Sequence, residues 1–430
     1  MNALQPEARL NDPAGWAMAE VMFAELRRIG DDGVGITREA YAAGEQAAME
    51  LIDRTARARG LSTSRDEAAN LVVTLHGAEP DLPFVACGSH VDSVPQGGNF
   101  DGAAGVLAGL MALARLKQDG FVPRRTIKLY VMRCEESAFF GRALVGSSAL
   151  LGQLSDADLN LPHVKSGRLL RNAMREVGAD VARIARGEML LDPASVDAWF
   201  ELHIEQGPVL VARDLPVAAV TGIRGNVRHR AVICHGEPGH SGAVPRWLRH
   251  DAMFAVAELL HVIDRHWQKA IEAGEDLVVT TGVVGTDPAE HAMSRIPGKV
   301  SFSFELRSQS QATLERFHAL FLAECDRISS ERGVRFDTGR RVDVPPSVMD
   351  PDLVSVMRAA IRAAGIADET IASGAGHDST SFALAGIPSV MLFVRNEHGS
   401  HNPREAMTME DFMQGADILR TALTERAHRA

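Results

Sequence analysis

Short apolar runs rich in β-branched residues alternate with helical patterns through the first half of the chain. A helical pattern at residues 44–60 precedes apolar runs at 70–77, 82–90 and 126–136, and a second helical pattern fills residues 101–120. Both helical patterns end at a glycine, which is typical of helix termini. Alternation of this kind predicts the α/β class, with a central, mostly parallel sheet.

The pattern changes after about residue 219 and returns near the C-terminus. A strand pattern at 225–237 is followed by a helix at 250–274, strands at 276–285 and 298–308, a helix at 313–333 and a strand at 334–339. This strand, helix, strand, strand, helix, strand order is ferredoxin-like. We therefore predict a discontinuous α/β domain of residues 1–218 and 337–430, with an inserted ferredoxin-like α+β domain of residues 219–336.

Composition excludes several classes of partner. A formal net charge of −11 and 46% hydrophobic residues are typical of a soluble globular protein and argue against a nucleic-acid or anionic-membrane surface. The longest apolar run, Phe382–Val394, is too short to span a bilayer. Residues 1–16 show no secretory signal, and the four scattered cysteines form no CxxC pair. A cytoplasmic protein with reduced thiols is expected.

Histidines and carboxylates follow several of the apolar runs. "GSHVDS" contains His90 and Asp92, "NFDGAAG" contains Asp101, "ELHIEQG" contains His203, and "HGSHNPRE" contains His401. Open α/β sheets bind ligands at the carboxyl ends of their strands, and imidazoles with carboxylates suit a zinc-type centre. Singly, Asp101 fits a helix N-cap and His401 a turn residue; jointly, the four segments favour a metal centre.

Two adjacent glutamates, Glu135 and Glu136, end the apolar run of residues 126–132. Because neighbouring side chains on a strand point in opposite directions, the pair is expected to face two ways and to serve two roles. Cys134 lies beside them, but a cysteine nucleophile needs an activating base. We interpret Cys134 as a packing residue.

The motifs "GSHVDSVPQGGNFDGAAGV", "ELHIEQGPVL", "GHSGAVP", "SGAGHDS" and "HGSHNPREAM" together resemble the hydantoinase/carbamoylase-type amidases. That family includes N-carbamoyl-L-amino-acid amidohydrolases, β-ureidopropionases and allantoate amidohydrolases, and belongs to the two-metal aminoacylase and carboxypeptidase superfamily. The resemblance covers nearly the whole chain. It implies that the discontinuous domain is catalytic and that the inserted domain is a lid through which a homodimer forms.

The resemblance also implies two divalent metal ions per chain. Zinc is the first expectation, and manganese, cobalt or nickel would suit the same nitrogen and oxygen ligands. The matching ligand positions are His90, Asp101, Glu136, His203 and His401, with Asp101 bridging the ions. Glu135 matches the general base. The positions behind the ligands are Asp92, which would orient His90, and His377 and Asp378.

Substrate contacts are implied at five further positions. His240 matches a catalytic histidine that polarises the scissile carbonyl across a dimer interface; the others are Gln206, Ser294, Arg307 and Gly376. Arg307 matches an arginine that clamps a substrate carboxylate, although a plain surface strand residue is the alternative. Ser294 stands where the family usually has asparagine, and "GHSGAVPR" places Arg246 where methionine is common. These two departures leave the exact substrate open.

The expected function is hydrolysis of a linear amide or ureido C–N bond by a metal-bridged hydroxide, with Glu135 as the general base. An N-carbamoyl-L-amino acid or related ureido acid is the first candidate substrate. The alternative is an aminoacylase or dipeptidase acting on N-acyl amino acids or peptides. A non-catalytic binding protein is a remote alternative, because such a protein should have lost ligands or the base.

Overall fold

The computed structural model describes residues 13–429. Most of residues 1–16, where the sequence predicts no secretory signal, therefore lies outside the described residues. The chain folds into two compact units. Unit 1 comprises the chain up to Gly222 and from Val348 onward, and unit 2 comprises Ile223–Ser347. The return to unit 1 comes later than the predicted residue 337, because β13 (Arg335–Asp337) and β14 (Arg341–Val344) both pair with a strand of unit 2.

The sheet of unit 1 has the order β1-β2-β4-β3-β5-β17-β6-β15, with β16 paired to β6. Its four neighbouring strands β4, β3, β5 and β17 are parallel, whereas β1–β2, β2–β4 and β17–β6 are antiparallel. The α/β class is confirmed, but the sheet is mixed, because short connections such as that between β1 and β2 can join only antiparallel strands. The strands are β1 (Ser62–Arg65), β2 (Leu71–Leu75), β3 (Phe84–His90), β4 (Ile127–Met132), β5 (Val196–Ile204), β6 (Val217–Ile223), β15 (Ser347–Val348), β16 (Thr370–Ser373) and β17 (Ser389–Val394).

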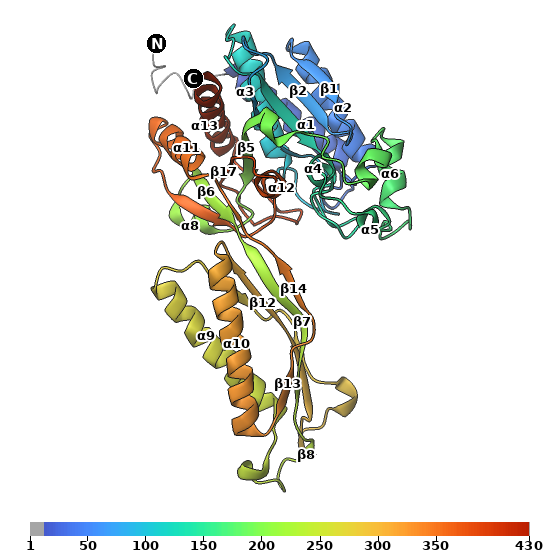
Figure 1. Ribbon diagram of the computed structural model, residues 1–430, viewed down its shortest axis with the longest axis vertical. Helices are drawn as coiled ribbons and strands as arrows, with labels where there is room; N and C mark the ends of the chain where they lie inside the picture. Colours follow the sequence, from blue (N-terminus) through green and yellow to red (C-terminus); the bar gives the residue numbers. More distant parts are fainter. Residues whose placement is uncertain (1–12, 430) are drawn as a thin grey trace. The chain divides into compact units, whose positions relative to one another are not determined.

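Helices cover both faces of this sheet (Figure 1). The larger hydrophobic core lies under α1 (Pro13–Gly30), α2 (Ala43–Ala58), α3 (Ala103–Gln118), α11 (Pro351–Ala363) and α13 (Met409–His428). The second core lies under α4 (Val145–Leu150), α5 (Asp156–Leu159), α6 (Leu170–Glu176), α7 (Val181–Ala185) and α12 (Ser379–Leu384), while α8 (Val209–Arg213) follows β5. Helix α3 is buried almost all round, as its apolar sequence predicts. Within residues 13–429, no helix has the length and apolarity needed to cross a membrane.

Unit 2 is an antiparallel sheet with two long helices packed on it (Figure 1). The sheet has the order β10-β12-β7-β13, with β14 paired to β7 and β9 paired to β12. The elements follow the predicted order along the chain; whether the unit is a lid or a dimerisation surface stays a prediction. They are β7 (Gly225–His235), β8 (Gly239–His240), α9 (Ala252–Glu272), β9 (Val278–Thr280), β10 (Val284–Gly285), β11 (Arg295–Ile296), β12 (Lys299–Ser308), α10 (Gln311–Arg332), β13 and β14.

The parallel strands bring the predicted chemistry to one edge of unit 1. His90 is the last residue of β3 and His203 the penultimate residue of β5; Glu135 follows the end of β4, and His401 follows the end of β17. Since β4, β3, β5 and β17 are parallel neighbours, their carboxyl ends meet at the same edge. Asp101 reaches this edge from the loop that begins α3.

Candidate metal centre

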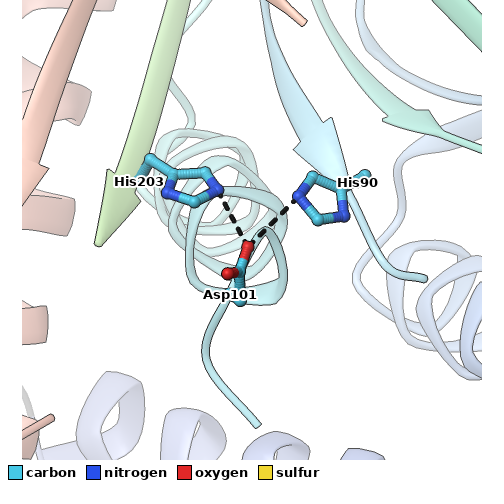
Figure 2. Close-up of side chains that lie close together, drawn as sticks. All are labelled: His90, Asp101 and His203. Carbon is cyan, nitrogen blue, oxygen red and sulfur yellow. Dashed lines mark ion pairs between the residues drawn. The ribbon is translucent and has the colours of Figure 1, made fainter. Parts of the chain in front are cut away.

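The first group of candidate ligands is wholly buried. Asp101 Oδ1 lies 3.4 Å from His90 Nε2 and 3.2 Å from His203 Nε2 (Figure 2). The three residues are 1–3% exposed. Gly102 follows Asp101 with φ of 64°, and a Cβ there would lie 2.5 Å from the His90 ring. A glycine is therefore required for the Asp101 loop to approach this histidine.

The second group shares Asp101 and extends toward solvent. His401 Nε2 lies 3.4 Å from Asp101 Oδ2 and 3.0 Å from Glu136 Oε1. The His401 side chain is 48% exposed, whereas that of Glu136 is only 8% exposed. In each group the ligand atoms lie within 4.8 Å of one another. Asp101 thus offers one oxygen to each group, as a bridging ligand would.

The electrostatics of the two groups fit divalent cations. Asp101 Oδ1 is buried and has no hydrogen-bond partner among the described residues. Burial alone would lower the pKa of His90, but the Asp101 and Asp92 carboxylates outweigh it and raise that pKa well above its usual range. Hydrogen bonds that His401 donates to the Asp101 and Glu136 carboxylates raise the pKa of His401 to about 10. The site therefore carries excess negative charge, which bound metal cations would offset.

A tight turn at Arg133 and Cys134, beyond β4, precedes the two adjacent glutamates. The prediction that they alternate along a strand is wrong, because β4 ends at Met132 and Cys134 adopts a left-handed φ of 50°. Asp92 accepts both backbone N–H groups, from Glu135 at 3.0 Å and from Glu136 at 3.1 Å. Glu136 reaches His401, while Glu135 Oε2 lies 3.9 Å from His90 Nε2. The turn, rather than a strand, gives the pair two directions.

Glu135 and Cys134 differ in what they can do chemically. Burial raises the pKa of Glu135 well above its usual range; His90 opposes this shift and the Glu136 charge adds to it. A carboxyl group with a raised pKa can both accept and return a proton near neutral pH. Burial also raises the pKa of the Cys134 thiol, so the nucleophilic thiolate is disfavoured.

Backbone and side-chain acceptors orient the buried histidines. His90 Nδ1 lies 3.0 Å from the Asp92 carbonyl oxygen and 3.4 Å from the Asp92 carboxylate. His203 Nδ1 lies 2.9 Å from the Ile204 carbonyl oxygen. Such contacts leave Nε2 of each ring directed at Asp101. Asp92 therefore lies beside His90, and its role in orienting this ring for a metal stays a prediction.

Two other predicted residues lie behind this edge and outside both ligand groups. The ring of His377 packs on that of His203 with centroids 4.4 Å apart, and its Nε2 lies 2.9 Å from Ser373 Oγ. Asp378 is fully buried and accepts a hydrogen bond of 2.6 Å from Ser147 Oγ. Neither residue is in a ligand group, and the role of both behind the ligands stays a prediction.

The candidate substrate residues of unit 1 are only partly explained by the structure. Gln206 Nε2 donates a hydrogen bond of 2.7 Å to Asp101 Oδ2, so this side chain reaches the metal-ligand edge. Gly376 is exposed, and a Cβ there would meet nothing within 4 Å. None of the residues that the structure describes therefore requires glycine at position 376.

Three further candidates lie in unit 2. His240 is exposed on β8, opposite Arg295 of β11, and the Ser294 carbonyl oxygen accepts a hydrogen bond of 2.8 Å from the Ser241 N–H. Arg307 lies on β12, with its guanidinium 3.1 Å from Glu305. Ser294 and His240 are thus brought together within the unit, and the substrate roles of all three stay predictions.

Sequence reasoning missed Ser400 and Glu405. Both lie in the quoted motif "HGSHNPRE", and both contact the Asp101 segment. An unassigned carboxylate in the same short loop as His401 was the available indication. Its partner is some 300 positions earlier in the chain, so only the fold could identify the contact.

Comparison with known proteins gives consistent results. Residues 86–425 match the family described as Peptidase family M20/M25/M40. An N-carbamoyl-L-amino acid amidohydrolase of Geobacillus stearothermophilus is 34% identical, over 93% of this chain and 96% of the relative. An allantoate amidohydrolase of Escherichia coli is 30% identical, over 92% and 94%. A crystal structure of a hydantoinase/carbamoylase family amidase from Burkholderia multivorans has a TM-score of 0.85 and 28% identity, over 96% and 98%. The chain therefore belongs to the M20/M25/M40 peptidase family, as an amidohydrolase of the carbamoylase and allantoate amidohydrolase type.

Proposed function

We propose that this enzyme hydrolyses a linear amide or ureido C–N bond at a centre of two divalent metal ions. The observation that carries the proposal is the sharing of Asp101 between two ligand groups, with Glu135 beside them. His90, Asp101 and His203 would hold one ion, and Asp101, Glu136 and His401 the other. When bound, such a pair of ions polarises a carbonyl group and makes water nucleophilic near neutral pH.

Glu135 is the residue assigned to move the proton. Its buried carboxyl has a raised pKa and lies beside the ligands without belonging to either group. It would take a proton from the attacking water and return it to the leaving nitrogen. Asp92 holds the backbone of this turn, so the position of the Glu135 carboxylate depends on it.

An N-carbamoyl-L-amino acid or related ureido acid is the proposed substrate class. The named relatives support this choice, because both act on compounds of that kind by their printed names. Arg307 is proposed to bind the substrate carboxylate, since a planar guanidinium suits bidentate recognition. Gln206, Ser294, Gly376 and His240 are the other proposed substrate contacts.

A product-release assay tests the proposal directly. Protein reconstituted with Zn²⁺, Mn²⁺, Co²⁺ or Ni²⁺ would be offered N-carbamoyl, N-formyl and N-acetyl amino acids, dipeptides and ureido acids, with ammonia and free amine both measured. Turnover confined to carbamoyl and ureido compounds is expected. Turnover confined to N-acetyl amino acids or dipeptides would replace the proposal with the aminoacylase or dipeptidase alternative.

The carboxylate contact has its own test in Arg307→Ala. We expect KM for carboxylate-bearing substrates to rise. The loss of binding free energy should be about 2–5 kcal/mol if the ion pair between Arg307 and the substrate carboxylate is desolvated. Arg316→Ala, on an exposed arginine of α10, is the control. An unchanged KM in Arg307→Ala would remove Arg307 from substrate binding and leave the metal centre untouched.

A further inference from the structure

Glu405 lies at the junction of the two ligand-bearing loops and is not itself in either ligand group. It is only 4% exposed. One carboxylate oxygen, Oε1, accepts the backbone N–H of Phe100 at 2.8 Å and that of Asp101 at 3.2 Å. The other, Oε2, lies 2.6 Å from the Ser400 hydroxyl. A single buried carboxyl group therefore joins the segment before α3 to the segment after β17.

Ser400 completes this connection to the bridging aspartate. Its hydroxyl lies within hydrogen-bond distance of both Glu405 Oε2 and Asp101 Oδ2. Asp101 Oδ2 is the oxygen that faces His401, the residue next to Ser400. The backbone of Asp101 and its side chain are thus both fixed by the loop that presents His401.

The neighbouring backbone is shaped to accept this carboxyl group. A Cβ at Gly98 would lie 2.1 Å from the Glu405 carboxylate, so only glycine leaves room for it. The rest of the loop between His90 and Asp101 is held from another side, where the buried Arg38 donates to the Val91 carbonyl oxygen at 2.6 Å and to Asn99 Oδ1 at 3.1 Å. Glu405 therefore supplies a contact that the loop does not otherwise have.

We infer that Glu405 is a positioning residue, which acts through Ser400 and the Asp101 backbone to hold the bridging aspartate in register with His401. This inference rests on the proposed metal centre. Loss of the contact should weaken chiefly the ion held by Asp101, Glu136 and His401, because those ligands come from the two loops that Glu405 joins. The ion of the strand-end histidines His90 and His203 should be affected less.

The test compares Glu405→Ala with Glu405→Gln, using Zn²⁺ titration of apo-protein against a chelator of known affinity. The amide oxygen of the new glutamine can accept both backbone N–H groups, and its NH₂ group can donate to the Ser400 oxygen. The Ser400 hydroxyl can then donate its hydrogen bond to Asp101. We expect Glu405→Ala to weaken the second Zn²⁺ by about 10–100-fold and Glu405→Gln to restore binding to within about threefold. Asp251→Asn is the matched control, since Asp251 is a buried carboxylate of unit 2 that also accepts two backbone N–H groups.

Two further variants keep the test valid if Glu405→Ala fails to fold. Ser400→Ala keeps the backbone contacts and removes the link to Asp101, so it should also weaken the second ion. Gly98→Ala should mimic the loss of Glu405, because the added Cβ would lie 2.1 Å from the Glu405 carboxylate and 2.4 Å from its Cβ, so the Glu405 side chain must move away.

The outcomes separate this inference from the proposed function. Wild-type protein that binds no second Zn²⁺ would overturn the two-ion centre itself. Wild-type binding of two ions, with Glu405→Ala unchanged or with Glu405→Gln as impaired as Glu405→Ala, would overturn the positioning role alone.

Discussion

The two ligand groups share one aspartate but are built in opposite ways. His90 and His203 lie at the ends of neighbouring buried strands, and each is no more than 2% exposed. His401 lies in a loop with a left-handed φ of 61°, and about half of its side chain is exposed. Ligands on sheet strands are held by the surrounding core, whereas a loop ligand depends on specific contacts such as those of Ser400 and Glu405.

This difference indicates that the two ligand groups contribute differently to the candidate centre. The buried group is held by strands whose neighbouring residues lie in the hydrophobic core, so it should persist whether or not metal is present. The exposed group, so called for its half-exposed His401, also includes the buried Glu136, which lies 3.0 Å from His401. In the proposed two-ion centre, substrate and solvent would therefore reach the ions from the side of His401.

The adjacent glutamates give the sharpest test of this difference between the two ligand groups. Glu135→Gln should lower kcat by about 10²–10⁴-fold while both ions stay bound, because the amide cannot accept a proton. Glu136→Gln should instead lose the ion of the exposed group. Bulk metal analysis beside kcat separates the two variants. Equal metal loss in both would show that the turn does not separate their roles, and near-normal kcat in Glu135→Gln would remove it as the base.

The histidines test the comparison through stability. His203→Ala leaves Asp101 Oδ1 buried without its nearest imidazole, so chelator-treated protein should lose about 1–3 kcal/mol of unfolding free energy. His401→Ala removes a half-exposed side chain and should cost about 0.5 kcal/mol. Urea unfolding midpoints of the two variants, measured without metal, give the comparison. Equal losses would mean that the exposed group is as much a part of the core as the buried one.

The buried group was also the more predictable from sequence. Apolar β-rich runs that end at His90 or close to His203 indicate strands, and open α/β sheets gather such ends at one edge. The mixed edges of the sheet and the turn at Cys134 were not predictable, because antiparallel pairing and a left-handed φ at a non-glycine residue depend on tertiary contacts. The same holds for Glu405, whose partners are distant in sequence.

Proton release should report on His401 directly. Its pKa is raised to about 10 by hydrogen bonds that it donates to Asp101 and Glu136, so near neutral pH this imidazole carries a proton that metal must displace. Because protons and metal compete, each displaced proton should weaken metal affinity by about tenfold per pH unit as the pH falls toward 6. Calorimetric titration with Zn²⁺ in two buffers of different ionisation enthalpy counts the protons released. His401→Gln should release about one proton fewer than wild type, since a glutamine has none to give up. An unchanged count would place the displaced protons on the buried histidines, and the exposed group would then differ from the buried one in position but not in protonation.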